Sequence, residues 1–555
     1  MQRDLPIRVG LLLSDEWLVA TRLLPDGRQR PAYAVLDPRR APPDSLPAAL
    51  AQVLDTLVPP GERNPAAPLD LALINLRPLA RLRRHELPQV ALLAPTGLQQ
   101  ALHASLRGTT SLSSATHDPS SPWFPWVGDA AELLSGYELR KLCPAENVLP
   151  VPIRQDASGA LVQSLSADAL PRLVQALRAL SVPAAALALM HSPRSLQPEH
   201  DLAQALQREG FLVVPSATQL ALQHGGGDER LRTRAAVLSA ALASSCEADL
   251  GGLRAGVPAG QPARFLTLRS DGIFAPSEQV PAWQQIVAPI AAGLIGVSRV
   301  ATASAGRDRF VCLIRDEPAM PQRDEALPSR LAVGLSLAAL CNHHEPGWPA
   351  VHAALCLGIP CELPALSAAL FPAAMSDPTA AHSAVQTLAA AYGYRLAAAQ
   401  DAGTASDAAH ALPTDASLSL VQAGWLDVLS LAALRARAVA ERVTPLFVEA
   451  SGAQHSGLIA AHLQRMRDEI MASIPEPARS SHATWPDPEW TAELRYQGQL
   501  GMLSLRGIGT GGPASRAASD LVVRFVAEHQ RVYGFSLPEC PVEIVQVRLR
   551  QPLSP

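Results

Sequence analysis

A mixed α/β fold is predicted by three features of the sequence: alternating strand-like and helix-like segments, a large apolar fraction and a low charge content. Short apolar runs typical of strands alternate with amphipathic segments of helical spacing along 555 residues. Hydrophobic residues make up 48% and charged residues 17% of the chain, which excludes wholesale disorder. At roughly 100–200 residues per domain, this length predicts three or four domains. The class is therefore α/β or α+β rather than all-α.

The amino-terminal part is predicted to open with a β-hairpin. Residues 7–13 and 17–23 are apolar runs, and Ser14-Asp15-Glu16 between them is typical of a tight turn. A helix over 46–57 and strands over 69–73 and 90–93 follow. The stretch 108–125 is rich in serine, threonine, aspartate and proline, which predicts a loop.

The remaining elements continue the alternation to the carboxyl terminus. Helices are predicted over 167–180, 199–209, 235–243, 286–302 and 517–530. Strands are predicted over 184–190, 211–214, 265–268, 310–314, 494–496, 503–505 and 542–549. Residues 331–341 and 350–357 are predicted to be buried segments, and 400–416 a linker or surface loop.

The charge balance excludes some classes of partner. The chain has 46 basic and 50 acidic residues and a formal net charge of -4. This balance argues against nucleic acid or an anionic membrane as the main partner. Lys141 is the only lysine, and no glycine-rich turn ends in Lys-Ser or Lys-Thr, so a P-loop is excluded.

The amino terminus and the cysteines predict a cytoplasmic location. Residues 1–13 lack the apolar segment followed by small residues that marks a signal peptide. Prolines interrupt the most apolar long stretch, 351–375, which favours a buried segment over a membrane helix. Seven cysteines without regular spacing are typical of a reducing compartment.

One group of metal-ligand residue types lies between Cys341 and Cys361. Its other members are His343, His344, His352 and Cys356. Zinc needs four such ligands in a fixed geometry, but no Cys-x-x-Cys or His-x-x-x-His pair occurs here. We favour small buried hydrophobic residues over a metal site, and a metal-dependent enzyme remains an alternative.

The carboxyl-terminal segment carries the most specific motif. Glu493-Leu-Arg-Tyr-Gln-Gly-Gln499 is followed in order by Phe525, Glu528-His529, Tyr533-Gly-Phe535 and Val542-Glu-Ile-Val545. This order resembles the closing segment of the hydantoinase A/oxoprolinase family, which also includes acetone and acetophenone carboxylase subunits. In that setting His529 and Tyr533 are interpreted as packing and hydrogen-bonding residues.

Further pieces resemble the same family in the same order along nearly the whole chain. They are Val90 to Leu98, Met190-His191-Ser192 with Pro198-Glu199-His200, Arg269-Ser-Asp-Gly272, Ala288 to Gly293, and Val351-His-Ala353. The resemblance implies an actin/hexokinase-like (ASKHA) two-lobed core with an additional C-terminal α+β domain. The expected boundaries are an N-terminal hydantoinase A-like domain over 1–178, the actin-like core over 179–390 and the C-terminal domain over 391–555.

The resemblance also implies a chemistry. Family members use ATP and Mg²⁺ to hydrolyse cyclic amides such as hydantoins and 5-oxoproline, or to carboxylate ketones. They work with a hydantoinase B-like or another family subunit on a small-molecule substrate. Neither nucleic acid nor membrane is an expected partner, and no metal ligand is assigned to a residue of this chain.

The sequence departs from the family at its phosphate-binding turns. Where the family has Asp-x-Gly-Gly-Thr after the first strand, this chain has Ser14-Asp15-Glu16. The second glycine loop is replaced around Asp316 and Pro318, and the third around Gly347, while a Gly-Thr-Thr turn is replaced near 75–78. Glycines let backbone N–H groups reach a phosphate, so their loss predicts a degenerate nucleotide site.

The candidate site residues follow from these positions. Candidate catalytic residues are Asp15, Asp316 and His191, and candidate cofactor-binding residues are Ser14, Asp271, Gly272, Gly293 and Gly347. His191 with Glu199 and His200 is a possible catalytic group. For these three residues we favour capping and solvation of a strand–helix connection. The polar stretch from Asp228 to Thr233 is interpreted as a solvated surface run.

The leading hypothesis is a catalytically degenerate partner subunit in an ATP-dependent amide hydrolase or ketone carboxylase complex. The alternative is an active ATP-dependent hydrolase or carboxylase that uses altered phosphate loops.

Overall fold

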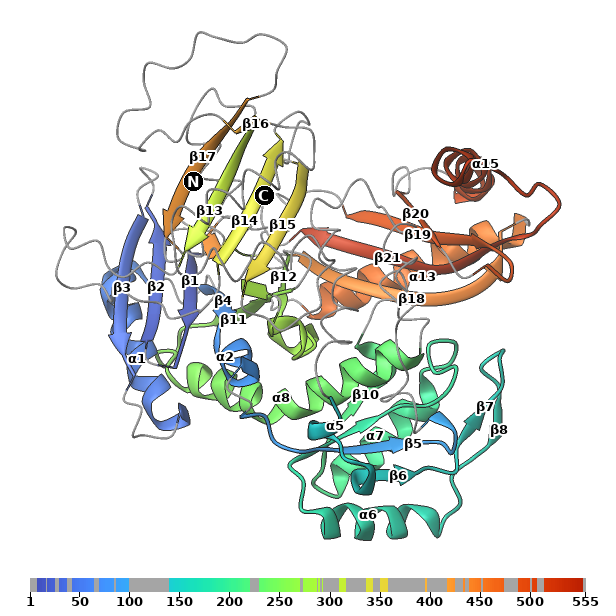
Figure 1. Ribbon diagram of the computed structural model, residues 1–555, viewed down its shortest axis with the longest axis horizontal. Helices are drawn as coiled ribbons and strands as arrows, with labels where there is room; N and C mark the ends of the chain where they lie inside the picture. The colour runs from blue at the N-terminus through green and yellow to red at the C-terminus, as the bar shows by residue number, and fades with distance from the viewer. Residues whose placement is uncertain are drawn as a thin grey trace.

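The protein is described here from a computed structural model. The residues it describes are 7–15, 17–24, 29–36, 42–63, 69–83, 86–98, 139–219, 229–269, 273–286, 288–289, 292, 309–315, 336–342, 350–357, 395–396, 417–424, 433–434, 439–450, 453–473, 488–499, 502–506 and 514–552. They form a mixed α/β fold with several sheets, as predicted (Figure 1). The predicted loop 108–125, the linker 400–416 and most of the helix 286–302 lie outside these residues.

A six-stranded sheet contains the amino-terminal hairpin. Its order is β12-β11-β4-β1-β2-β3, where β1 is Ile7–Leu13, β2 Trp17–Leu23, β3 Gln29–Val35, β4 Leu69–Asn75, β11 Ala263–Leu268 and β12 Phe274–Pro276. The hairpin is confirmed, with Leu13 paired to Leu18. Strands β1, β4 and β11 are parallel, so their carboxyl ends meet at one edge of the sheet.

One face of this sheet is covered by α1 (Pro42–Leu57), which contains the predicted helix. Leu46, Leu50 and Val53 recur at helical spacing and are fully buried. They form a core with Leu11 of β1 and Leu71 of β4.

A second, parallel sheet has the order β10-β9-β5-β6. Its strands are β5 (Ala91–Ala94), β6 (Val148–Pro150), β9 (Ala184–Leu187) and β10 (Leu212–Pro215). Helices α6 (Ala169–Leu180) and α7 (Gln197–Arg208) pack on it through Leu173, Leu177, Leu202 and Leu206. The chain runs from β5 to β6 and then crosses back to β9 on the other side of β5. The topological switch point therefore lies between β5 and β9.

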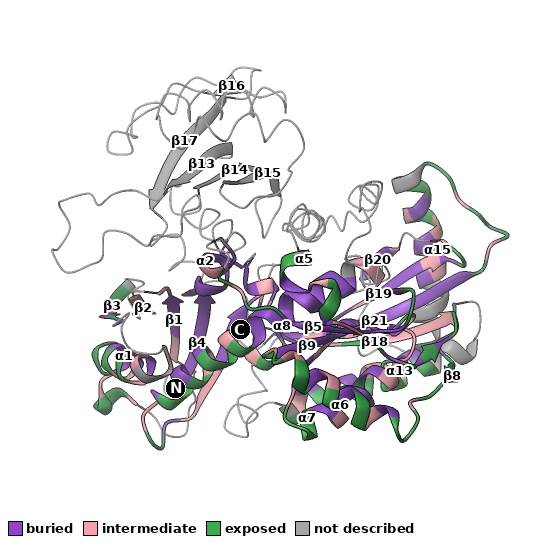
Figure 2. Ribbon diagram, turned by 60° about the horizontal axis from the view of Figure 1, so that its bottom comes forward, coloured by how far each residue is buried: buried purple, intermediate pink, exposed green. Residues whose placement is uncertain are grey.

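One long helix, α8 (Glu229–Ala255), connects the two sheets. Its first half packs on β9 and β10, and its second half packs on α1 (Figures 1 and 2). Ala235 to Leu242 are almost all fully buried, and Leu253 joins the core beneath α1. The sequence had predicted only 235–243 as helix.

A two-stranded hairpin of β7 (Arg154–Gln155) and β8 (Leu161–Gln163) and two larger sheets complete the described fold. One has the order β15-β14-β13-β17-β16, with β13 Arg309–Arg315, β14 Ser336–Asn342, β15 Ala350–Leu357, β16 Arg395–Leu396 and β17 Ser417–Gly424. The other, termed the C-terminal sheet, has the order β18-β21-β19-β20, with β18 Val439–Glu449, β19 Glu489–Tyr496, β20 Leu503–Arg506 and β21 Val542–Pro552. Helices α13 (Ala453–Ser473) and α15 (Ala514–Tyr533) pack against the C-terminal sheet.

Within the described part of the chain, no helix is long and apolar enough to cross a membrane.

Candidate functional site

Only some of the predicted site residues fall in the described part of the chain. Ser14 and Asp15 lie at the carboxyl end of β1, and His191 lies between β9 and α7. Asp271, Gly272, Gly293, Asp316 and Gly347 are outside the described residues. The described candidate residues thus lie in two regions. One is the edge of the six-stranded sheet where β1 and β4 end, and the other surrounds His191.

Ser14 closes the hairpin turn that leads into β2. Its backbone N–H donates to the carbonyl of Trp17 (2.9 Å), and its hydroxyl accepts from the N–H of Trp17 (3.0 Å). The Ser14 hydroxyl is thus used within the turn itself, as serine hydroxyls commonly are at turns. Ser14 therefore acts as a turn residue here.

Arg77 fills the space next to this turn. It is the first residue of α2 (Arg77–Arg83), which begins just after β4, and it is only 3% exposed. Its Nε donates to the carbonyl of Ser14 (2.9 Å), and its Nη1 lies 2.5 Å from Oδ1 of Asp249. The carboxylate of Asp15 is 3.7 Å from the same Nε.

Asp249 comes from α8 and is 1% exposed. Its second oxygen, Oδ2, accepts from Nδ2 of Asn75 (3.2 Å), which also donates to Oε1 of Gln285 (3.3 Å). The Oδ1 of Asn75 accepts from the backbone N–H of Arg77 (3.2 Å). Both oxygens of the buried carboxylate are therefore bonded within the protein.

This arrangement has a clear electrostatic consequence. Open α/β sheets bind ligands outside the carboxyl ends of their strands, which is where Arg77 lies. Among the described residues, Arg77 contacts two carboxylates, Asp15 and Asp249, which offset its positive charge. A phosphate would meet these two carboxylates and an arginine already committed to the protein's own acceptors.

The sequence did not identify Arg77 as a site residue. The stretch 75–78 was recognised only as the replacement of a family turn. The signal that could have found Arg77 was its position directly after a fully buried strand, where polar side chains reach the sheet edge.

His191 does not form a group with Glu199 and His200. Its Nδ1 is 3.5 Å from Oε1 of Glu229, and its backbone N–H donates to the same oxygen (2.9 Å). His200 is exposed and contacts Gln204 on its own helix. The possible catalytic group is therefore not assembled.

Glu199 is buried, which corrects the interpretation that it solvates the strand–helix connection. Its carboxylate accepts from the backbone N–H groups of Leu189 (2.7 Å) and Ala217 (2.9 Å) and from the hydroxyl of Ser216 (2.9 Å). Burial raises the pKa of Glu199, although these hydrogen bonds and Arg232 oppose the shift. The residue fixes two loops at the edge of the four-stranded sheet.

The prediction of a solvated run from Asp228 to Thr233 is wrong at its carboxyl end. Arg232 is 1% exposed and Thr233 is fully buried in the first turns of α8. Arg232 lies among Leu189, Ser192 and the carboxylate of Glu199, so its charge has a partner inside the protein. Arg232 and Asp249 are 17 positions apart on one helix, which places them about 25 Å from each other.

The C-terminal motif residues form a packed cluster, as interpreted from the sequence. His529 is fully buried, and its ring contacts those of Tyr496, Phe525 and Phe535 at centroid distances of 4.8, 5.6 and 5.0 Å. Its Nδ1 lies 2.8 Å from the carbonyl of Phe535, and its Nε2 lies 3.1 Å from Nε2 of Gln499. The side chain of Tyr533 is outside the described residues.

A buried ionic network joins the C-terminal sheet to the end of β11. Glu441 contacts Arg550 (2.6 Å), Arg269 (2.8 Å) and Arg548 (3.8 Å). Burial alone would raise its pKa, but the three arginines hold the pKa of Glu441 well below its ordinary value. Glu493, 1% exposed, accepts from Gln546 (2.5 Å) and Arg548 (3.4 Å). Burial raises the pKa of Glu493 to about 7.

No group of three or more histidine, cysteine, aspartate or glutamate residues is placed to hold a metal ion in the described part of the chain. The side chains between Cys341 and Cys361 lie outside that part, so the metal alternative there stays a prediction.

The structure of the chain is similar to solved structures of known proteins. No protein-family model and no curated protein match the sequence. The structure is similar to the nucleotide-free structure of acetone carboxylase, with a TM-score of 0.61 and 13% identity over 98% of this chain and 87% of that chain. It is also similar to the ATP-dependent caprolactamase from Pseudomonas jessenii, with a TM-score of 0.57 and 15% identity over 98% of this chain and 87% of that chain. Both are hydantoinase/oxoprolinase-family members, which confirms the predicted resemblance at the level of the fold.

Proposed function

We propose that this chain is a hydantoinase/oxoprolinase-type subunit whose nucleotide site has been closed. It serves as a non-catalytic partner in an ATP-dependent cyclic-amide hydrolase or ketone carboxylase complex. Its core is of the actin/hexokinase-like two-lobed type with an additional C-terminal α+β domain, divided near residues 178 and 390. Its partner is a hydantoinase B-like or another family subunit in the cytoplasm.

The observation that carries this proposal is the contact of Arg77 with Ser14 and Asp249. The resemblance places a glycine-rich phosphate turn at 14–16 and a second family turn at 75–78. In this chain the two replaced turns touch, and an arginine side chain lies between them. Breaking a buried ion pair of this kind is strongly unfavourable, so a ligand would have to displace a contact that stabilises the fold.

The absence of a glycine at the first turn supports the same conclusion. Asp15, whose side chain is 35% exposed, adds negative charge where a phosphate would have to approach. The backbone N–H of Ser14 donates to Trp17 and is not available to an oxyanion.

Co-purification tests the partner role. The tagged full-length chain is isolated from its native host, and bound proteins are identified by mass spectrometry. The proposal predicts a stoichiometric second subunit, and release of ADP by the complex that is unchanged in the Asp15→Asn variant. Isolation of the chain alone, with ADP release from hydantoin, 5-oxoproline or acetone turnover, would overturn it.

The alternative is an active ATP-dependent hydrolase or carboxylase with altered phosphate loops. It is favoured only by the partial exposure of the Asp15 carboxylate at the edge of the sheet. Asp15→Asn would abolish ADP release in this case, so the same assay separates the two functions.

A further inference from the structure

A loop held by backbone hydrogen bonds presents Arg194 at the carboxyl end of β9, beside the topological switch point of the four-stranded sheet. The backbone N–H of Arg194 donates to the carbonyl of His191 (2.9 Å), and the carbonyl of Ser195 accepts from Nε2 of Gln155 (3.0 Å). A Cβ on Gly159 would lie 2.8 Å from the Cβ of Arg194, so the hairpin tip at Gly159 packs tightly on this loop. The position of Arg194 is thus set by several independent contacts.

His191 holds the start of this loop in an uncommon conformation. Its φ is 57°, in the left-handed region that is unfavourable for a residue with a Cβ. The backbone hydrogen bond to Glu229 keeps it there. Such conformations persist only where the surroundings enforce them, and they are frequent at ligand sites.

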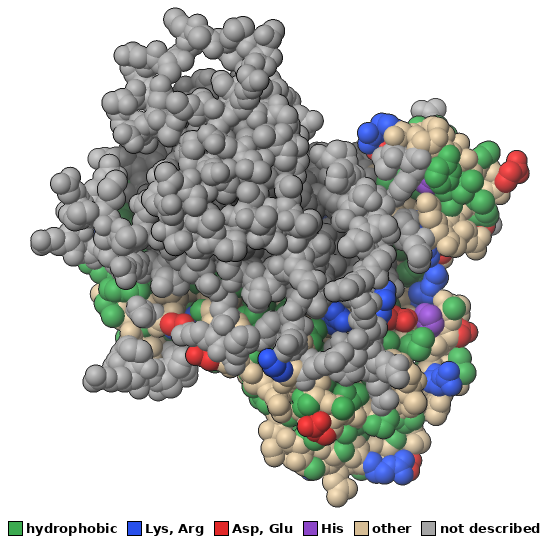
Figure 3. Space-filling model, in the orientation of Figure 1, with side chains coloured by type: hydrophobic (Ala, Val, Ile, Leu, Met, Phe, Trp, Pro, Cys, Tyr) green, Lys and Arg blue, Asp and Glu red, His purple; other side chains and the backbone are tan. Residues whose placement is uncertain are grey.

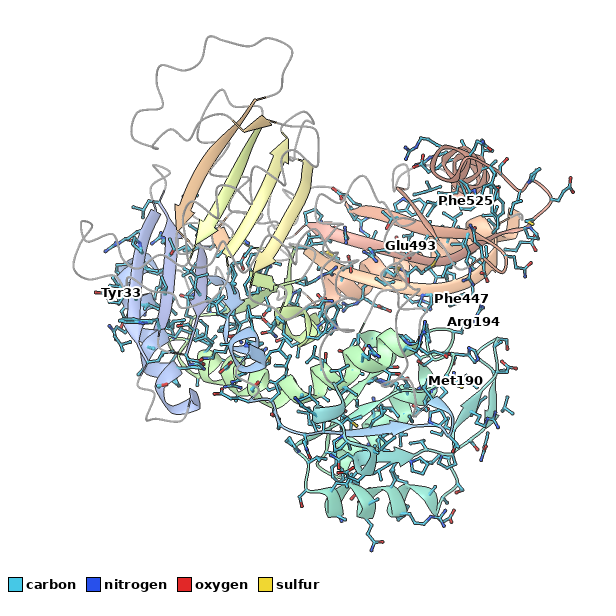
Figure 4. The ribbon with its side chains drawn as sticks, in the orientation of Figure 1. Tyr33, Met190, Arg194, Phe447, Glu493 and Phe525 are labelled. Carbon is cyan, nitrogen blue, oxygen red and sulfur yellow. The ribbon has the colours of Figure 1, made fainter. Side chains whose placement is uncertain are left out.

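The aromatic ring of Phe447, in the C-terminal sheet, contacts the guanidinium of Arg194. The guanidinium carbon of Arg194 is 4.1 Å from the centroid of the Phe447 ring (Figure 4). Phe447 has a φ of 49° and lies in a bulge, where the pairing of β18 with β21 shifts between Pro445 and Val448. A stacked arginine keeps its N–H edge free for a planar acceptor, because the aromatic ring occupies only its face.

The edge of the Arg194 guanidinium has no hydrogen-bond acceptor among the residues that the structure describes. The nearest carboxylate, Glu543, is 3.8 Å from its Nη1, beyond hydrogen-bond distance. The oxygen that faces Arg194 is Oε1 of Glu543, whereas its Oε2 accepts from Nε of Arg495 at 2.7 Å. Arg194 and Arg495 carry two positive charges here, and Glu543 and Glu449, which are paired across β18 and β21, carry two negative charges. The Arg194 side chain is 29% exposed. Figure 3 shows basic, acidic and histidine side chains gathered where these parts of the molecule face each other.

We propose that Arg194, backed by Phe447, is the receptor for an oxyanion group of a small molecule, a carboxylate or a phosphate, between the four-stranded sheet and the C-terminal sheet. Both groups present two oxygens that match the parallel N–H donors of an arginine. The site is independent of the turn around Ser14. An experiment that disproves the partner role therefore leaves this site untouched, and an experiment that disproves this site leaves the partner role untouched.

Calorimetric titration of the full-length chain at low salt tests the site, with sodium propionate in one arm and inorganic phosphate in the other. Saturable binding in at least one arm is expected, and the arm that binds identifies the oxyanion. Arg194→Met, which keeps an apolar stem on Phe447, should lower the affinity at least about tenfold. Arg172→Met, on the exposed face of α6 with a side chain 71% exposed, should leave the affinity unchanged.

Two further variants separate recognition from a structural role. Arg194→Lys retains the charge but not the planar donor pair, so binding should weaken. Glu543→Gln removes the competing carboxylate, so binding should tighten about threefold or more. A residue that only stabilises the fold would not produce tightening. Absence of saturable binding in both arms would overturn the proposal, as would equal affinity in Arg194→Met.

Discussion

The guanidinium of Arg77 and the carboxylate of Asp249 form a buried ion pair, 2.5 Å apart, at the edge of the six-stranded sheet where β1 and β4 end. Arg77 follows β4, whereas Asp249 belongs to the long helix that also packs on the four-stranded sheet. The pair therefore ties the predicted nucleotide region to the helix that connects both sheets.

Removal of Arg77 should destabilise the protein strongly. Arg77→Met leaves Asp249 buried without its counter-ion, and we expect a loss of about 3–5 kcal/mol in the free energy of unfolding. Urea denaturation measures this loss. The double variant Arg77→Met with Asp249→Asn should recover part of it, because no uncompensated charge remains. A loss below about 1 kcal/mol, the level expected for exposed Arg172→Met, would contradict the account.

Replacement by alanine of two glycines at the carboxyl end of α8 should change the stability of the protein in opposite directions. A Cβ on Gly256 would lie 2.5 Å from the carbonyl oxygen of Pro47 in α1, so Gly256→Ala should cost about 1–3 kcal/mol. A Cβ on Gly251, in the exposed face of α8, meets nothing within 4 Å. Gly251→Ala should stabilise by roughly 0.5–1 kcal/mol. The change in the thermal unfolding midpoint of each variant gives the sign of its effect on stability. Equal changes in the two variants would show that α8 does not approach α1 as described.

Ionisation of Glu493 should lower stability as pH rises. Its pKa is raised from an ordinary 4.5 to about 7 in the folded state, so between these values the folded state holds a proton that the unfolded state has lost. Stability conferred by this group therefore falls from pH 4.5 to about pH 7 and then levels off. Glu493→Gln removes the effect and should be more stable than wild type at pH 8, by as much as about 3 kcal/mol.

Comparison of the two proteins at each pH isolates this group from Glu441, whose depressed pKa acts in the opposite direction. Stability from Glu441 is present above its ordinary pKa and is lost on acidification. If the difference in the free energy of unfolding between wild type and Glu493→Gln is the same at pH 5 and pH 8, the buried, proton-binding state of Glu493 is refuted.

Cysteine labelling should distinguish buried from accessible thiols. Burial raises the pKa of Cys143 and of Cys246 to about 12, so neither forms much thiolate near pH 8. Cys540 is half-buried and should react with iodoacetamide first among these three. Peptide mass spectrometry of native and urea-unfolded protein provides the comparison. Early native labelling of Cys143 would mean that its surroundings are open.

Local patterns in the sequence predicted many of the described elements, but not β3, β17, β18, α2 or α13. The apolar runs on either side of Ser14 are enough to specify the first hairpin, because strand and turn signals act over neighbouring residues. Strand β3 was missed, and Pro31 within it explains why, since proline disfavours a strand assignment. It is tolerated there because β3 is at the edge of its sheet.

The charged residues were harder to place from the sequence. Arg232 looked solvated because local polarity predicts exposure, whereas its partner Glu199 is 33 positions away and reaches it only through the fold. Arg77 and Asp249 are separated by 172 positions. Long-range ion pairs carry no local pattern, so the loss of the glycine turns could be predicted, but the side chain that occupies the region could not.

Calorimetric titration of the full-length chain with Mg-ATP tests most directly whether Arg77 and its partners close the proposed nucleotide site. No saturable heat is expected at micromolar nucleotide, in wild type and in Arg194→Met alike. Binding of Mg-ATP with micromolar affinity that persists in Arg194→Met would contradict this closure.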